Sequence, residues 1–320
     1  MTEERLVLDA ELWLVEELLF SARRDRIVSQ LEHHGLTAAQ ARQQVERIDR
    51  SDGMARLRRR LATARRAEGL DRLRRTVDPP PDTLPTATSV DRGTLWRDHW
   101  VRSRPLHLPG WGRALPLVHR WSFPWLQERF GGAEVQVNVE RQAAQRPADV
   151  ERHHEPMAFG ELLRLAQGPA SDARYAVSRS GLLAQPGLQA LWNDLGDLPS
   201  PLVDPEPPRG VALWIGPAGT HTRAHFDPHH VLLVQVQGRK RVRLAPPPPP
   251  EAAATLDGWY LQGPLEDALE VELAPGDALF LPASWLHEVH ALAPSITLSF
   301  LSFGWPNHFH FLGPTGSDDR

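Results

Sequence analysis

The sequence predicts a mainly β domain, a sandwich or barrel, preceded by an α-helical region. Three observations lead to this prediction. Apolar residues recur at helical spacing up to about Val77, a proline-rich stretch runs from Asp78 to Pro85, and short β-prone runs separated by turn residues follow it. A chain of 320 residues is long enough for one large domain with a smaller one beside it.

The composition excludes several classes of protein and of site. Hydrophobic residues make up 41% and charged residues 24%, as in ordinary globular proteins, and a net charge of −4 gives no overall attraction to nucleic acid or anionic membrane. No apolar run approaches the roughly 18–20 residues of a membrane helix, and the start lacks signal-peptide features, so we expect a cytoplasmic protein. Because cysteine is absent, only His, Asp, Glu or water can hold a metal.

Residues 1–77 are expected to form helices. The first helical unit has apolar residues at spacings of three and four, namely Leu12, Val15, Leu18 and Leu19, and ends at Gly35. A second helix begins at Thr37, because Thr-Ala-Ala-Gln has the form of a capping box. A third begins near Met54 and carries nine arginines up to Thr76.

The arginines of this third helix allow two interpretations. They could bind nucleic acid or an acidic partner, or they could form a solvated helix face. The second interpretation is favoured by an apolar stripe that a homodimer contact could cover, formed by Leu57, Leu61, Leu70 and Leu73. We therefore expect a dimerisation or recruitment region at residues 1–77, and a homodimer rather than a nucleic-acid complex.

Residues 78–94 are a predicted linker, and residues 95–320 the β domain. The predicted strands are Glu134–Val139, Val211–Ile215, Val231–Val236, Val242–Leu244, Leu269–Leu273, Ala278–Leu281 and Ile296–Phe303. Short helices are expected near Phe159–Leu165 and Leu188–Leu195, and the five prolines at 246–250 predict a stiff extended loop.

Three residues carry the pattern of a metal site. His225 and Asp227 stand two apart, so on a strand their side chains would project to the same side. His287 follows the predicted strand Ala278–Leu281. A chain with 15 histidines contains His-x-Asp pairs by chance, so the pair alone is weak evidence. Two histidines and one carboxylate on a rigid sheet nevertheless match the facial triad of non-haem iron oxygenases, which leaves positions open for co-substrate and O₂.

Lys240 adds a second kind of evidence. After Gly238 the residues alternate, so that Arg239, Arg241 and Arg243 share one face of a strand and Lys240 falls on the apolar face. An unpaired ammonium inside a barrel costs several kcal/mol, roughly, or loses its proton, so it needs an anion. The far carboxylate of a dicarboxylate would serve; alternatively, the lysine could reach water at the end of the strand.

Several motifs together resemble the JmjC and cupin-like oxygenases, among them the asparaginyl hydroxylase of hypoxia-inducible factor. They read G-T-x-T-x-x-H-x-D-P, V-Q-G-R-K-R-V-x-L and P-G-D-x-L-F-L-P-x-x-W-x-H, and the resemblance spans about Trp96 to Trp305. It implies a double-stranded β-helix of the cupin or jelly-roll type that uses Fe(II), 2-oxoglutarate and O₂.

The resemblance also implies roles for single residues. His225, Asp227 and His287 would be the iron ligands, and Thr222 and Lys240 would bind the C5 carboxylate of 2-oxoglutarate. Ser299 falls where the asparaginyl hydroxylase has an Asn near the co-substrate.

Two departures bear on the substrate. Val231 stands where several members carry Asn, and Ser178 stands where relatives often place Gln or Asn. Both changes remove amide groups near the co-substrate or substrate. Together with Trp285, which is more often a packing residue than a substrate contact, they are the candidates for the substrate pocket.

The predicted reaction is hydroxylation of a C–H bond, with release of succinate and CO₂. A peptide or protein side chain is favoured as substrate over a free metabolite, partly because eleven tryptophans could supply groove anchors, among them Trp111, Trp121, Trp259, Trp285 and Trp305. The alternatives are N-methyl demethylation, hydroxylation of a free amino acid or natural product, and a catalytically silent cupin that only binds.

Overall fold

The computed structural model describes residues 3–20, 23–77, 79–139, 154–177, 181–195, 202–204, 210–249, 251, 256, 259–307 and 309. The contacts within the chain define two compact units, of which the first reaches Arg65 and the second begins at Arg66. Among the described residues, no helix has the length and apolar character needed to cross a membrane.

The first unit is helical. Its helices are α1 (Glu3–Phe20), α2 (Arg24–His33), α3 (Ala38–Asp49) and the first part of α4 (Asp52–Val77). Thr37 caps α3 with the expected capping box, in which its side chain accepts from the Gln40 amide. The first predicted helical unit is in fact two helices, α1 and α2. A buried cluster joins the helices: Leu14, Leu18, Ile27, Leu31, Ala41, Val45, Ile48 and Met54.

The last part of α4 belongs to the second unit. Leu70 is fully buried and packs with Phe226 and Leu286. Arg66 is 2% exposed, and its guanidinium lies 5.0 Å from the centre of the Phe226 ring, a cation–π arrangement. The boundary between the two compact units thus falls within α4, between Arg65 and Arg66, whereas the sequence predicted a boundary after residue 77. The functions assigned to residues 1–77, 78–94 and 95–320 stay predictions.

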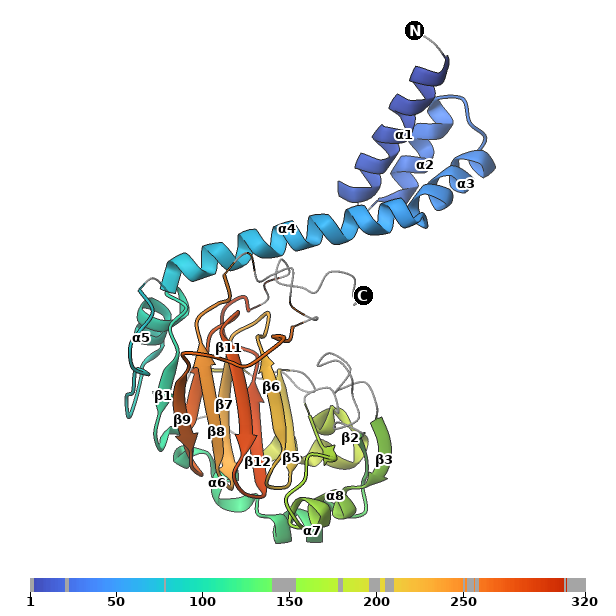
Figure 1. The fold of residues 1–320 in the computed structure, drawn as a ribbon. Helices are drawn as coiled ribbons and strands as arrows, with labels where there is room; N and C mark the ends of the chain where they lie inside the picture. The colour runs from blue at the N-terminus through green and yellow to red at the C-terminus, as the bar shows by residue number, and fades with distance from the viewer. Residues whose placement is uncertain are drawn as a thin grey trace. The chain divides into compact units, whose positions relative to one another are not determined.

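Two antiparallel sheets form the framework of the second unit (Figure 1). One has five strands in the order β1-β10-β7-β12-β5, and the other has four in the order β6-β11-β8-β9. The strands are β1 (Leu106–Leu108), β5 (Val211–Gly216), β6 (His221–His225), β7 (Val231–Gln237), β8 (Lys240–Ala245), β9 (Leu269–Leu273), β10 (Ala278–Leu281), β11 (Leu286–Ala291) and β12 (Ser295–Phe300). This is the predicted cupin-type double-stranded β-helix.

Smaller elements flank the sheets. A third sheet has the order β3-β2-β4. Its strands are β2 (Glu134–Val139), β3 (His154–Ala158) and β4 (Arg174–Tyr175). The helical elements are α5 (Arg92–Thr94), η1 (Leu95–Trp100), η2 (Trp111–Ala114), α6 (Pro116–Arg120), α7 (Phe123–Phe130), α8 (Phe159–Ala166), η5 (Leu182–Ala184) and η6 (Pro186–Asp194).

Most strand predictions are confirmed. Glu134–Val139, Leu269–Leu273 and Ala278–Leu281 have the predicted bounds, whereas the last strand ends at Phe300 instead of Phe303. The runs predicted as strands did not include β6 and β11, because their sequences, His-Thr-Arg-Ala-His and Leu-His-Glu-Val-His-Ala, are rich in polar residues. These two strands carry most of the candidate site.

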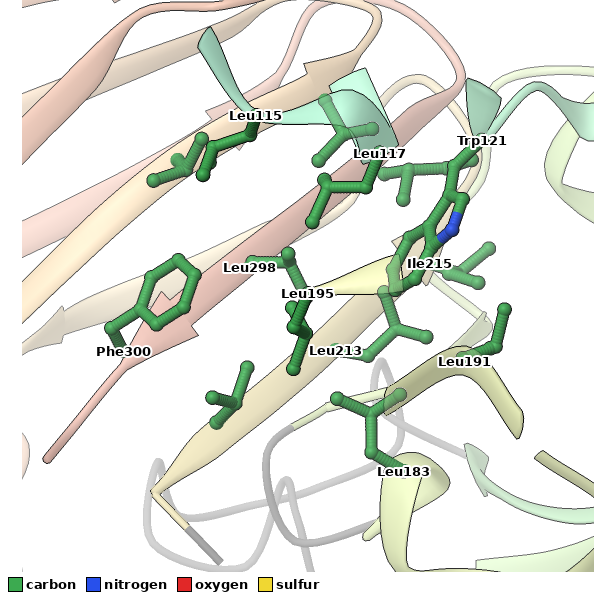
Figure 2. Packing of buried hydrophobic residues seen from close by; sticks show 14 of the residues in the cluster. Leu115, Leu117, Trp121, Leu183, Leu191, Leu195, Leu213, Ile215, Leu298 and Phe300 are labelled. Atoms are coloured by element: carbon green, nitrogen blue, oxygen red, sulfur yellow. The ribbon is translucent and has the colours of Figure 1, made fainter. Parts of the chain in front are cut away.

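The five-stranded sheet is covered on its outer face by a large apolar core. Figure 2 shows part of it, where Leu115, Leu117 and Trp121 lie near strand residues such as Leu213, Leu298 and Phe300. Alternate residues of β7 point to opposite faces of the five-stranded sheet. Leu232 and Val234 belong to this outer core, whereas Val231 contributes to a second core with residues of the opposite sheet. The outer core packs against one face of the five-stranded sheet and holds the sheet in place. The opposite, inner face of the sheet is therefore the one that can contribute to the site.

Candidate metal and co-substrate site

The three residues of the predicted metal site lie close together. His225 ends β6 and pairs directly with His287 of β11, and the centres of their rings are 4.1 Å apart. Asp227 stands just beyond β6, and its Oδ2 is 3.7 Å from Nε2 of His287. One ligand atom from each of the three residues lies within 4.8 Å of the others. The argument that put both side chains on one side assumed a strand through His225 and Asp227, but β6 ends at His225 and Asp227 lies just beyond it.

Hydrogen bonds orient both imidazoles. Nδ1 of His225 donates to the carbonyl oxygen of Arg223 at 2.8 Å, and Nδ1 of His287 donates to that of Trp285 at 3.0 Å. A carbonyl oxygen only accepts, so Nδ1 carries the proton and the lone pair of each ring resides on Nε2. Both rings therefore hold the tautomer that binds a metal through Nε2.

The protonation states also suit a metal ion. Burial lowers the pKa of His287 to about 4, and the neighbouring His225 acts in the same direction, so His287 is neutral near pH 7. Burial acts to raise the pKa of Asp227, but the histidines around it outweigh that effect and lower it, so the carboxyl is ionised. A neutral His287 and an ionised Asp227, together with the imidazole of His225, fit an Fe(II) facial triad.

Lys240 lies in the same interior, at the start of β8. Its side chain is buried, with 4% exposed, while Arg241 beside it faces solvent, as the alternation predicted. Nζ donates to the hydroxyl of Tyr175 at 3.0 Å. Burial lowers the pKa of Lys240 to about 7, which reflects the free-energy cost of an ammonium with so little solvation.

Polar side chains from the five-stranded sheet lie near this lysine. The ring of Tyr175 is 5.8 Å from that of Trp214, whose Nε1 donates to Oγ of Ser299 at 2.7 Å. Ser299 is buried, with 3% exposed, and so is Thr222 on β6, with 6% exposed. The contacts thus link Lys240 to Ser299 through Tyr175 and Trp214.

Sequence reasoning did not single out Tyr175 or Tyr260. Tyr175 comes from the strand β4, which has two residues and is too short for any sequence period to predict it. The one signal in the sequence is that Tyr175 stands in a β-prone stretch that begins near Ala173. Tyr260 follows the proline-rich loop and stacks on His225, with ring centres 5.3 Å apart. Its segment pairs with β6, since the Leu261 amide donates to the carbonyl oxygen of Ala224.

Two of the three candidate pocket residues fall within the described part of the chain. Val231 and Trp285 are buried in the apolar core between the sheets, and the Trp285 indole donates to the carbonyl oxygen of Ser103 at 2.7 Å. Both residues pack in the core, and their role toward a substrate stays a prediction. Ser178 lies outside the described residues.

Comparisons with known families agree with this architecture. The family described as a cupin-like domain matches residues 92–252, which is half of the chain, and the JmjC domain family matches residues 207–308. The chain belongs to the cupin-like, JmjC-type oxygenase family. This family uses Fe(II) and 2-oxoglutarate, and the residues described above fit both.

Individual relatives of this cupin-like protein have different activities in their names. Lysine-specific demethylase 8 of Xenopus tropicalis is 24% identical over 232 residues, which cover 64% of this chain and 49% of the relative. The tRNA wybutosine-synthesizing protein 5 of Danio rerio is 27% identical over 247 residues, covering 65% of this chain and 72% of the relative. The chain spans only 27% and 49% of the first two curated relatives.

A solved structure is also similar. It is the ribosomal oxygenase YcfD of Escherichia coli in complex with cobalt and 2-oxoglutarate, which is 19% identical to this chain. The similarity covers 69% of this chain and 53% of that protein, with a TM-score of 0.44.

Proposed function

We propose that this cupin-like protein is an Fe(II)- and 2-oxoglutarate-dependent dioxygenase that hydroxylates a C–H bond of a peptide or protein side chain, releasing succinate and CO₂. The observation that carries the proposal is the meeting of His225, Asp227 and His287 in one interior with a buried lysine. A module that only binds a ligand has no need of a metal with open positions, which argues against a silent cupin.

The proposed metal ligands are Nε2 of His225, Nε2 of His287 and the carboxylate of Asp227. When bound, Fe(II) would couple the oxidative decarboxylation of 2-oxoglutarate by O₂ to the hydroxylation of the substrate. The protein's part is to orient the ligands through their Nδ1 hydrogen bonds and to exclude water.

The proposed co-substrate residues are Lys240, Thr222, Ser299 and, beyond the sequence-based set, Tyr175. A buried ammonium whose hydrogen bond goes to a neutral phenol favours a carboxylate partner, since the charged pair would offset the cost of burial. The Tyr175 hydroxyl is placed to donate to the same carboxylate. Ser299 accepts from Trp214, so its own hydroxyl proton remains to be donated.

Only some of the tryptophans in the oxygenase region lie where they could contact a peptide or protein substrate. Trp121 and Trp285 are fully buried in the core, so their positions lend no support to a role as groove anchors. Trp259 packs against Phe226 and Arg66, whereas the next residue, Tyr260, lies against His225. We propose that Tyr260 forms part of one wall of the substrate site.

The second candidate function is N-methyl demethylation, which the name of the Xenopus relative favours. The same site would serve, because hydroxylation of an N-methyl carbon releases formaldehyde. The name of the Danio relative makes tRNA a substrate to be tested as well, although the net charge of −4 does not favour it.

Two measurements test the proposal. The first is succinate formation from 2-oxoglutarate, which requires added Fe(II) if the protein is an oxygenase and does not occur if it is a silent binding module. The second is mass spectrometry of peptides and cell extract offered as substrates. A gain of one oxygen, about 16 Da, supports hydroxylation, and formaldehyde with loss of a methyl group supports demethylation.

We also propose that the helical unit mediates homodimerisation. Its described residues include three large apolar side chains that are strongly exposed: Leu12 at 56%, Phe20 at 67% and Leu57 at 41%. Most arginines of α4 face solvent and do not indicate a buried charged interface, although the Arg65 guanidinium lies 5.9 Å from the centre of the Phe20 ring. A second copy of the same unit would cover the apolar residues.

A further inference from the structure

A second group of metal-binding side chains lies on the outer face of the four-stranded sheet. It consists of His221 on β6 with Glu288 and His290 on β11, and one ligand atom from each lies within 4.8 Å of the others. His221 and His290 are paired across the two strands, and their rings stack in parallel, 4.0 Å apart. All three residues are partly exposed, so an ion could reach them.

The group is separate from the proposed iron site, although it uses the same two strands. On β11 the side chains alternate, so His287 and Val289 face the interior while Glu288 and His290 face outward. Outward-facing Arg241 and Arg243 of β8 pair with these two residues in the sheet, which confirms the side. We propose that His221, Glu288 and His290 bind a divalent transition-metal ion, Zn²⁺ in the first place.

The donor atoms suit such an ion. Nε2 of His221 lies 2.8 Å from Oε1 of Glu288, so an ion would replace the proton between them. The ring nitrogens of His290 have no hydrogen-bond partner among the described residues, so no contact fixes the tautomer, and either nitrogen can offer the one lone pair that coordinates an ion. Two imidazoles and one carboxylate, with water as a fourth ligand, are a common set for Zn²⁺.

The surrounding charges are arranged to keep Glu288 available. Arg243 donates to Oε2 of Glu288 at 3.0 Å, which orients the carboxylate and leaves Oε1 toward His221. Arg241 and Arg239 form ion pairs with Glu270 and Glu272 of β9, at 3.2 Å and 2.6 Å. Arg241 and Arg239 are therefore paired with carboxylates outside the group, whereas the carboxylate that pairs with Arg243 is Glu288 itself.

Occupancy of this outer site would join β6 to β11. These strands carry His225 and His287, so the ion would fix the spacing between the two histidines from the opposite face of the sheet. We therefore expect Zn²⁺ at the outer site to raise the thermal stability of the protein, independently of whether the interior site holds a metal.

The test uses full-length protein stripped of metal, in a His225→Ala/Asp227→Ala background that leaves His287 as the sole member of the interior triad. Zn²⁺ binding is measured by calorimetry and by the shift of the melting temperature. Three further proteins are compared in this background, carrying His290→Gln, His221→Gln or the control His119→Gln. His119 is exposed and bonds to the Arg113 carbonyl, away from either group.

The background protein and its His119→Gln variant should each bind one equivalent of Zn²⁺ and melt at a higher temperature with it. The His290→Gln and His221→Gln variants should lose both effects. X-ray absorption at the zinc edge of the background protein should show two imidazole ligands, a result that does not depend on the folding of any outer-site variant. Absence of Zn²⁺ binding in the background, or binding that both glutamine variants retain, would overturn the proposal.

Discussion

His225 pairs directly with His287, whereas Thr222, three residues before His225, pairs with Val289. Between these two pairs, two residues of β6 stand opposite the single residue Glu288 of β11, which is the arrangement of a β-bulge. On a regular strand, residues three apart face opposite sides. The bulge therefore allows Thr222 and His225 to face the same interior, and brings the proposed co-substrate and metal residues together.

The first prediction concerns the metal ligands. Separate substitutions His225→Ala, Asp227→Ala and His287→Ala should each abolish Fe(II)-dependent succinate formation, because the loss of one of three ligands leaves too few to hold the ion. Circular dichroism should show that the variants remain folded, and His119→Ala serves as the control. Full activity in the His287→Ala variant would show that the third ligand has been wrongly assigned.

The second prediction concerns the anchor for 2-oxoglutarate. Lys240→Met keeps the length of the side chain and removes its charge, so the KM for 2-oxoglutarate should rise. Loss of a charged hydrogen bond costs about 2–4 kcal/mol, or roughly 30- to 1,000-fold. Tyr175→Phe removes a neutral donor and should raise KM by only about 2- to 10-fold. Iron binding should persist in both variants, and an unchanged KM in Lys240→Met would rule out the assignment.

The third prediction is a pH dependence of co-substrate binding. The pKa of Lys240 in the free protein is lowered to about 7 by burial, and the charged form is the one that binds a carboxylate. Below pH 7 the lysine is charged, so the KM for 2-oxoglutarate should be flat. Above pH 7 the free protein loses the proton, and KM should rise by up to about tenfold per pH unit.

A matched variant isolates this effect. Lys240→Arg keeps a positive charge that does not titrate in this range, because a guanidinium has a pKa above about 12. Its KM should therefore show no increase between pH 7 and pH 9, whatever its absolute value. If the wild-type protein and the arginine variant had the same pH profile, titration of Lys240 would not be its cause.

The strands of high apolar content and the three residues of the metal triad could be predicted from the sequence. His225 and Asp227 stand two apart, and a Pro-Gly-Asp turn and a strand precede His287, so the positions can be read from the motif. The face of Lys240 followed from the alternation after Gly238, and its burial confirms it.

Three features could not be read from the sequence, for physical reasons. The bulge in β6 depends on pairing with β11, a contact more than 60 residues away, and nothing local marks it. Tyr175 reaches Lys240 from a two-residue strand, too short for any period to be detected. The last turns of α4 resemble the preceding ones in sequence, yet Leu70 and Arg66 pack on the oxygenase domain.

The fourth prediction concerns the helical unit. Phe20→Glu and Leu57→Glu place charges on exposed apolar positions, so they should convert a dimer to a monomer without unfolding the unit. Light scattering on the full-length variants gives the mass, and Glu16→Lys, which changes charge at an exposed polar position of α1, is the control. A dimer of unchanged stability in both glutamate variants would exclude these residues from the interface.

The last prediction concerns the substrate. The segment with Trp259 and Tyr260 lies along β6, where Tyr260 stacks on His225 and Trp259 packs against Phe226 and Arg66. An aromatic side chain beside the metal site, such as Tyr260, can anchor an extended chain. Val231, which is buried, stands where the resemblance places an amide, and this counts in the other direction because a smaller, less polar site would suit a compact free amino acid. On balance we expect peptides to stimulate succinate formation more strongly than free amino acids do. Tyr260→Ala should raise the KM for a peptide while the KM for 2-oxoglutarate changes little, because Tyr260 and Lys240 contact different groups of the site.

A screen of free amino acids, peptides and tRNA for stimulated succinate formation decides the class of substrate. Strong stimulation by one free amino acid, with none by any peptide, would contradict the prediction and assign the aromatic segment to packing.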